Sequence, residues 1–341
     1  MDVATIVVVT IAVALVFDII NGFHDAANSI ATIVSTRVLS PKYAVLWAAA
    51  FNFIALFIFQ TGVAQTIAKI VAVQASDPAF VYVVMCGLIG AIAWNLLTWW
   101  LGLPASSSHA LIGGLSGSGV AYHGFGVLNT KTLYPTIEWI ILAPLVGLVL
   151  GMFMMILVSW LFKKSRPRSV DKTFRVGQLF SAGMYSIGHG GNDAQKTIGV
   201  IIAVLVASGH LHFNDAGKLV EGMPTWIVFA SYGAMAFGTA IGGWRIVKTM
   251  GMGITHLKPV GGFCAEVAGA ATLFGATHFK IPVSTTHTIT GAIIGVGSVT
   301  KLRGIRWGLA TRIVWAWILT IPAAALVGAS LLWLVQALGA W

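Results

Sequence analysis

The sequence predicts an all-α integral membrane protein made of two inverted repeats, with discontinuous helices and about 10–12 membrane segments. Three observations lead to this fold class. The 341 residues are 57% hydrophobic and only 9% charged, whereas roughly a quarter of the residues in a soluble domain are charged. Apolar segments long enough to span a bilayer recur along the whole chain. Two polar motifs each occur once in either half.

Long apolar segments predict the membrane helices in order along the chain. We expect spans at 3–21, 43–63, 80–101, 136–162, 225–243, 259–279 and 307–338. Further apolar segments, broken by Gly, Pro or polar clusters, lie at 24–36, 104–122, 178–208 and 282–300. The segments 104–122 and 282–300 either cross the membrane or form re-entrant hairpins. Cys86 and Cys264 lie in apolar segments, so we expect packing roles and no disulfide.

Loop charges predict the orientation. If each half crosses the membrane five times, one side holds 14 of the 20 Lys and Arg residues, in loops 37–42, 163–175, 243–258 and 301–306. The positive-inside rule assigns this side to the cytoplasm. The opposite loops, 64–79, 123–135 and 209–224, carry one Lys each. We therefore expect the basic charge to set the topology and not to steer an anion from outside.

An odd number of crossings makes the halves antiparallel, which is the inverted-repeat relation. We expect a first repeat at 1–162, a basic cytoplasmic linker at 163–176 and a second repeat at 177–341.

A polar motif, Asn21 to Ser29, follows the uncharged run from Val3 to Phe17. An Asp near the centre of a membrane helix costs roughly 2.5–3.5 kcal/mol on insertion scales and normally faces a protein interior or a watery cavity. Asn21 and Gly22 predict a break in the helix, which would free carbonyls to coordinate a cation. The alternative is a hydrated bend at the membrane surface, with Asp25 capping the next helix.

The second half repeats this motif in Gly188 to Ile198, where Asp193 follows Asp25 by 168 residues. Polar breaks at corresponding positions of two halves are typical of the binding site of a secondary transporter. The repetition therefore favours the cation site over the surface bend.

The other duplicated motif is Pro104 to His109, repeated 178 residues later in Pro282 to His287. We expect each Pro in the first turn of a helix. A helix N-terminus offers free N–H groups to an anion, and the neighbouring hydroxyls add uncharged donors. Two such termini could hold a tetrahedral oxyanion between them. The alternative is that these hydroxyls bond to carbonyls of their own helix.

The aspartate motifs and the hydroxyl motifs together describe a symporter. The candidate coupling-cation residues are Asp25, Asn28, Asn192 and Asp193. The candidate anion-binding residues are Ser106, Ser107, Ser108, Ser284, Thr285 and Thr286. Four histidines accompany the motifs, either as proton carriers or as buried hydrogen-bond donors: His24, His109, His189 and His287. Glu266 and Arg312 are candidate intramembrane charges, unless Arg312 snorkels to the interface.

These motifs, GFHDAANSIAT, GGNDAQKTIG, PASSSH and PVSTTH, resemble those of the inorganic phosphate transporter (PiT) family along nearly the whole chain. The resemblance implies uptake of phosphate coupled to Na⁺ or H⁺. It implies that Asp25, Asn28 and Asp193 serve the coupling cation and that the Ser/Thr clusters hold phosphate. It also implies a multi-pass protein of the inner (cytoplasmic) membrane.

The second half departs from the family pattern at Lys196, which stands where the first half has Asn28. Lys196 lies one helical turn after Asp193, and a buried ammonium needs a partner. We therefore expect Lys196 to pair with Asp193, to fill one cation position and to favour H⁺ over Na⁺. The alternative is that Lys196 points into a cytoplasmic vestibule.

Two other functions remain open. One is symport of sulfate or another tetrahedral oxyanion. The other is an intramembrane serine hydrolase, which needs a nucleophile on a strained turn beside an oxyanion hole, although such a motif need not be duplicated. We expect no enzyme activity, no cofactor and no nucleic-acid partner. The lipid bilayer is a partner, a homodimer is one option for the oligomeric state, and the identity of any metal ion is left open.

Overall fold

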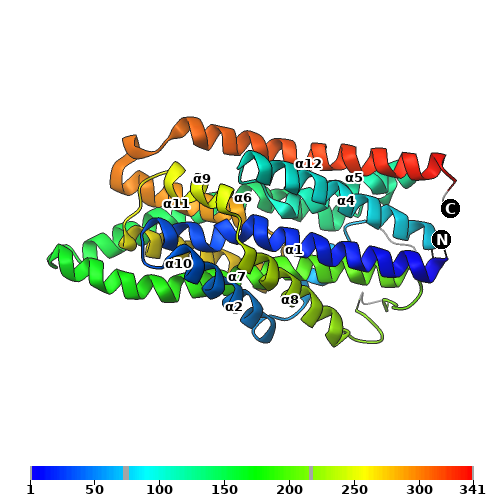
Figure 1. Cartoon of the computed structure of the whole chain (residues 1–341), viewed down its shortest axis with the longest axis horizontal. Helices are drawn as coiled ribbons and strands as arrows, with labels where there is room; N and C mark the ends of the chain where they lie inside the picture. The colour runs from blue at the N-terminus through cyan, green and yellow to red at the C-terminus, as the bar shows by residue number, and fades with distance from the viewer. Residues whose placement is uncertain (1, 72–76, 215–217, 340–341) are drawn as a thin grey trace.

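The computed structural model describes residues 2–71, 77–214 and 218–339 and is largely helical (Figure 1). The first half contains α1 (Val3–Ser35), α2 (Pro41–Ile54), η1 (Ala55–Phe57), α3 (Gly62–Ile67), α4 (Pro78–Leu101), α5 (Ser107–His123), η2 (Phe125–Val127) and α6 (Thr130–Leu161). The second half contains α7 (Pro167–Ala207), α8 (Thr225–Ile241), α9 (Trp244–Gly253), α10 (Pro259–His278), α11 (Thr285–Lys301), η3 (Leu302–Gly304) and α12 (Trp307–Ala337).

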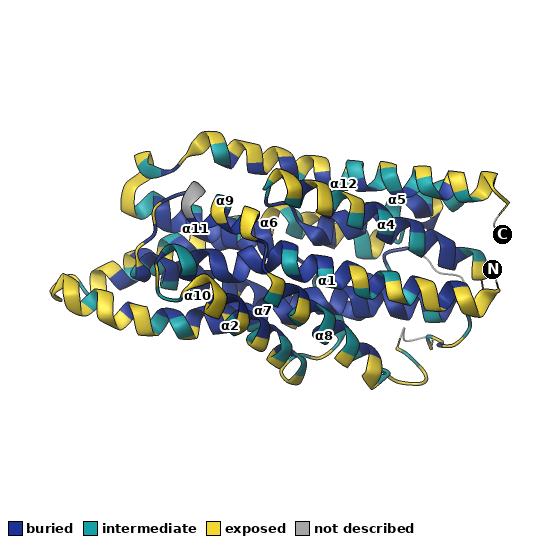
Figure 2. Ribbon diagram, in the orientation of Figure 1, coloured by how far each residue is buried: buried dark blue, intermediate teal, exposed yellow. Residues whose placement is uncertain are grey.

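Several of these helices suit a membrane. Within the described residues, five helices are long and apolar enough to cross a bilayer, or six if α8 and α9, bent by 72°, form one span. The predicted all-α membrane protein is confirmed. The outer helices α6 and α12 carry long exposed stretches, whereas α1 and α7 are buried where they carry the aspartate motifs (Figure 2).

The second half repeats the order of elements of the first. Each half has a long inner helix (α1, α7), a broken helix (α2–α3, α8–α9), a helical hairpin (α4–α5, α10–α11) and a long outer helix (α6, α12). In Figure 1, α1 runs away from the end of the molecule that holds both termini, and α6 and α7 are joined at the opposite end. α1 and α7 therefore run antiparallel, as two inverted repeats require.

Duplicated glycines allow the hairpin of each half to pack closely against the outer helix of the other half. A Cβ on Gly113 of α5 would lie 2.5 Å from the carbonyl oxygen of Ile321 in α12. A Cβ on Gly291, the equivalent residue of α11, would lie 2.1 Å from that of Pro144 in α6. Only glycine permits this approach of two helix backbones, so the matched glycines have matched packing roles.

The predicted break at Asn21–Gly22 is wrong. α1 continues through it, which also merges the expected segments 3–21 and 24–36, and α7 continues through the glycines at 188–191. Gly costs up to about 1 kcal/mol in a helix, but here it allows contact, since a Cβ on Gly22 would lie 2.3 Å from Met235 O. The discontinuities lie instead in the helices that pack on these glycines, α2–α3 and α8–α9.

The hairpins α4–α5 and α10–α11 have buried tips. Ala105 and Val283, in the two connectors, are buried, and the first residues of α5 and α11 contact α1 in the interior. This arrangement favours re-entry over a full crossing for the segments 104–122 and 282–300.

The expected position of Pro104 and Pro282 in the first helical turn is wrong. Each helix begins three residues later, because Ser106 and Ser284 act as N-caps and accept hydrogen bonds from the backbone N–H groups of His109 and His287 at 3.3 and 3.2 Å. Serine is among the preferred N-cap residues.

The linker expected at 163–176 is helical from Pro167 onward, and the repeat boundary itself stays a prediction.

We expect the α6–α7 turn to be cytoplasmic and the α7–α8 connection to be external. Ser165→Cys should then react with an impermeant maleimide only in inverted vesicles, and Val220→Cys only in intact cells. Both native cysteines are buried, so the background should be low. Labelling of both sites from the same side would contradict the antiparallel arrangement.

Candidate cation and anion site

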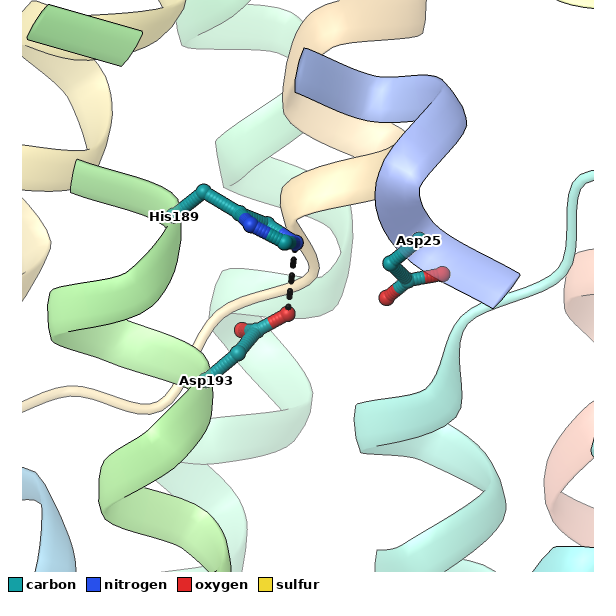
Figure 3. A group of neighbouring side chains, drawn as sticks. All are labelled: Asp25, His189 and Asp193. Carbon is teal, nitrogen blue, oxygen red and sulfur yellow. Dashed lines mark ion pairs between the residues drawn. The ribbon is translucent and has the colours of Figure 1, made fainter. Parts of the chain in front are cut away.

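The two motif aspartates meet at the centre of the protein. Asp25 on α1 and Asp193 on α7 are buried, and with His189 they offer ligand atoms that all lie within 4.8 Å of one another (Figure 3). His189 Nε2 lies 3.4 Å from Asp193 Oδ2. A surface bend at Asp25 is therefore excluded, and oxygen and nitrogen atoms that could hold a cation are present.

Hydroxyl groups from the N-termini of α5 and α11 complete this cluster. Ser107 Oγ donates to Asp25 Oδ2 at 2.5 Å, and Thr286 Oγ1 donates to Asp25 Oδ1 at 3.4 Å. Thr285 Oγ1 donates to Asp193 Oδ2 at 3.0 Å. The expected cation residues and anion residues thus form one hydrogen-bond network, which joins both halves.

The two motif asparagines have different surroundings. Asn28 Nδ2 donates to Thr286 Oγ1 at 2.9 Å and to Thr285 Oγ1 at 3.2 Å, which places it in the network. Asn192 instead donates to Ile281 O at 3.1 Å and accepts from Val283 N at 3.2 Å. Asn192 therefore holds the α10–α11 connector in place.

Lys196 is buried and its ammonium group has three partners. It pairs with Asp193 and donates to Ser108 Oγ at 2.5 Å and to Val283 O at 2.9 Å. These contacts use the three donors of an ammonium group. The expected pairing with Asp193 is confirmed, and the alternative position in a cytoplasmic vestibule is wrong.

Four of the six predicted hydroxyl residues face the network: Ser107, Ser108, Thr285 and Thr286. Ser106 and Ser284 instead use their side-chain oxygens as N-caps, and in this way fix the direction of the two helix N-termini.

The motif histidines fall into two classes. His24 bonds Asp25 Oδ1 at 2.8 Å and Thr98 Oγ1 at 3.1 Å. His189 bonds Asn52 Oδ1 at 3.2 Å, besides its contact with Asp193. The rings of His109 and His287 instead contact each other edge to face, with centroids 4.4 Å apart. Within the described residues, the ring nitrogens of this second pair have no hydrogen-bond partner.

The other intramembrane candidates lie outside the network. Glu266 is buried and accepts hydrogen bonds from Thr32 at 2.6 Å, from Gln178 at 3.0 Å and from Ser181. Arg312 is exposed near the start of α12, which agrees with the snorkelling interpretation.

Asp18 was missed by the sequence analysis. It is fully buried in α1, two turns before Asp25, and Asn21 Nδ2 lies 3.5 Å from its Oδ1. A carboxylate within a membrane helix is itself a signal of function. Asp18 escaped notice because it ends the apolar run and has no equivalent in the duplicated motif.

Two antiparallel halves therefore bring two aspartates, a buried lysine and the hydroxyl-bearing N-termini of two helices to one buried site. Such a site at the interface of inverted repeats defines a secondary transporter.

Comparison with known proteins identifies the family of secondary transporters to which the chain belongs. Residues 21–328 match the model of the phosphate transporter family. A Rhizobium meliloti (strain 1021) protein, described as a "probable low-affinity inorganic phosphate transporter", is 54% identical over 321 residues, which cover 94% of this chain and 93% of that one. A Bacillus subtilis (strain 168) protein of the same description is 44% identical over 331 residues, with 96% and 97% covered.

A solved structure titled "The sodium-dependent phosphate transporter" superposes with a TM-score of 0.87 at 24% identity and covers 98% of this chain and 99% of its own. This likeness shows a shared fold. The chain belongs to the phosphate transporter family, and it is a multi-pass protein of the cytoplasmic membrane.

We expect Ser107→Ala and Thr285→Ala each to weaken phosphate binding. The loss of a hydrogen bond to a charged group costs about 1.5–3 kcal/mol, which is roughly a 10- to 150-fold loss of affinity. Equilibrium binding of labelled phosphate to the purified protein measures this. Ser298→Ala is a matched control, since that hydroxyl donates to Ile294 O of its own helix. Wild-type phosphate affinity in both single variants and in the double variant would show that these two hydroxyls do not bind phosphate.

Proposed function

We propose that the protein takes up inorganic phosphate across the cytoplasmic membrane by symport with protons. In this proposal phosphate lies between the N-termini of α5 and α11, and hydroxyls of Ser107, Ser108, Thr285 and Thr286 bind its oxygens. Asp25, with Asn28 beside it, carries the coupling site. The names of the bacterial relatives support phosphate as the substrate.

The position of Lys196 is the observation that favours H⁺ over Na⁺ as the coupling ion. Lys196 stands at the position equivalent to Asn28, and its ammonium group pairs with Asp193. A fixed positive charge there takes the place that a metal cation would need on the second aspartate. Coupling then falls to Asp25, whose carboxylate bonds a histidine that can share a proton with it. The solved structure of the sodium-dependent protein shares the fold at only 24% identity, so its coupling ion is not carried over.

The carboxylate of Asp25 favours phosphate over sulfate. It accepts a hydrogen bond from Ser107, one of the proposed phosphate ligands, so in this proposal it lies beside the bound anion. Phosphate retains a proton near neutral pH and can donate it to a carboxylate, whereas sulfate has none to donate.

The arrangement does not favour a hydrolase. The Ser107 hydroxyl donates to a carboxylate and not to a histidine. His109, the histidine of the same motif, has no hydrogen-bond partner among the described residues. A serine nucleophile needs a hydrogen-bonded general base. We therefore propose a transporter without enzyme activity.

Uptake of labelled phosphate into proteoliposomes, with sulfate as competitor, tests the substrate. We expect saturable phosphate uptake that excess sulfate leaves largely unchanged. Equal uptake of labelled sulfate, or no phosphate uptake by correctly folded protein, would overturn the proposal.

A further inference from the structure

A cavity of about 440 Å³ opens beside the proposed phosphate site, and four lysines line it: Lys69, Lys131, Lys218 and Lys280. They come from separate parts of the chain, namely the end of α3, the start of α6, the α7–α8 connection and the α10–α11 connector. α4 and α8 begin toward the end of the molecule that holds both termini (Figure 1). The charge pattern of the loops makes this end external.

The four lysines that line this cavity are most of the basic residues outside the loops that we assign to the cytoplasm. Apart from those loops, the chain has only six Lys and Arg residues: Lys69, Lys131, Lys196, Lys218, Lys280 and Arg312. Four of them line the one cavity, and Lys196 lies in the site itself. None of the described residues that line the cavity is acidic. From the loop charges we expected no basic charge to steer an anion from outside, because one lysine per loop gives no sign that the loops meet.

The cavity lies against the α10–α11 connector, whose next residue contacts the central site. Ile281 and Pro282 form part of its wall. The next residue, Val283, accepts hydrogen bonds from Lys196 Nζ at 2.9 Å and from Ser108 Oγ at 3.2 Å. The α10–α11 connector therefore borders both the cavity and the central site.

The cavity wall also offers hydroxyl donors, on Thr66, Thr132 and Thr136. Lys69 is partly oriented, because its ammonium group lies 5.3 Å from the centroid of the Phe213 ring. Concave clefts lined by one sign of charge focus the field and raise the local concentration of an oppositely charged solute, with on-rates raised about 10- to 1,000-fold. Lysine is a compact, strongly hydrated point charge, which suits transient capture rather than tight binding.

We propose that this cavity is an external capture site for free phosphate, distinct from the central site and filled before it. The proposal rests on the proposed function, since it assumes that phosphate is the transported anion. Its four lysines raise the rate at which phosphate reaches the α10–α11 connector, and they leave the maximal transport rate unchanged.

The test is initial phosphate uptake into right-side-out vesicles by the double variant Lys131→Gln, Lys218→Gln. We expect a KM about ten-fold higher than wild type at low ionic strength, an unchanged maximal rate, and convergence of the two proteins at high ionic strength, where exposed charges are screened. Lys131→Arg, Lys218→Arg should retain the wild-type KM because it retains the charge. Lys42→Gln, Lys164→Gln removes two exposed lysines of the cytoplasmic end and should also match wild type.

Three results would overturn the capture site: an unchanged KM in the Gln variant, an equal change in the cytoplasmic control, or an effect seen only in vesicles with anionic lipids, which would indicate a lipid headgroup. Failure of wild-type vesicles to take up any phosphate would overturn the proposed function as well. The two failures are therefore distinguishable.

Discussion

Replacement of Asp25 by Asn is expected to abolish phosphate uptake almost completely. Asn has nearly the same shape and still accepts a hydrogen bond from Ser107, which donates to the carboxylate at 2.5 Å. The substitution removes only the negative charge and the ability to take up a proton. Because Lys196 pairs with Asp193, the proposed mechanism leaves Asp25 as the coupling site.

Uptake into proteoliposomes under an imposed pH gradient measures this loss, and the thermal midpoint of the purified variant shows whether it is folded. Asp171→Asn is the matched control, since Asp171 is exposed and pairs with Arg175 near the start of α7. Uptake by a folded Asp25→Asn variant at more than half the wild-type rate would exclude Asp25 from coupling.

Replacement of Lys196 by Asn is expected to create a response to Na⁺ that the wild type lacks. The substitution places at position 196 the residue type of its first-half equivalent, Asn28. It leaves Asp193 buried without its ion-pair partner. Loss of one member of a buried ion pair costs about 3–5 kcal/mol. A cation that binds the vacated position stabilises the folded state by mass action. Na⁺ should therefore raise the thermal midpoint of the variant but not that of the wild type.

The double variant Asp193→Asn, Lys196→Asn is the control for this prediction, because it has no unpaired charge to attract a cation. It should fold and show no response to Na⁺, and choline chloride should control for ionic strength. An equal effect of Na⁺ on the wild type and on Lys196→Asn would show that the lysine does not occupy a cation position.

Duplication is the feature that made most of the site predictable. The repeated motifs indicated a duplicated chain, a transport site that includes the two aspartates, and two hydroxyl-bearing helix N-termini around one anion, while the loop charges indicated that the halves are antiparallel. The pairing of Lys196 followed from helical spacing and from the cost of burying a lone charge. Each of these inferences depends on local sequence and on symmetry, both of which a single chain displays.

The features that escaped prediction depend on contacts between distant segments. Gly22 was expected to break α1, yet it serves close packing against Met235, and a glycine in isolation does not distinguish these roles. Asn192 shares its motif with Asp193 but bonds the α10–α11 connector. The four lysines that line the cavity lie on separate segments of the chain, so only the folded chain shows that they converge.

The most direct test of the account is uptake of labelled phosphate by the wild-type protein in proteoliposomes under separate proton and Na⁺ gradients. The account predicts that an inward proton gradient drives accumulation in the absence of Na⁺, and that a Na⁺ gradient at constant pH adds little. Strong accumulation driven by Na⁺ at fixed pH, with no effect of the proton gradient, would contradict the assignment of Lys196 to the second cation position.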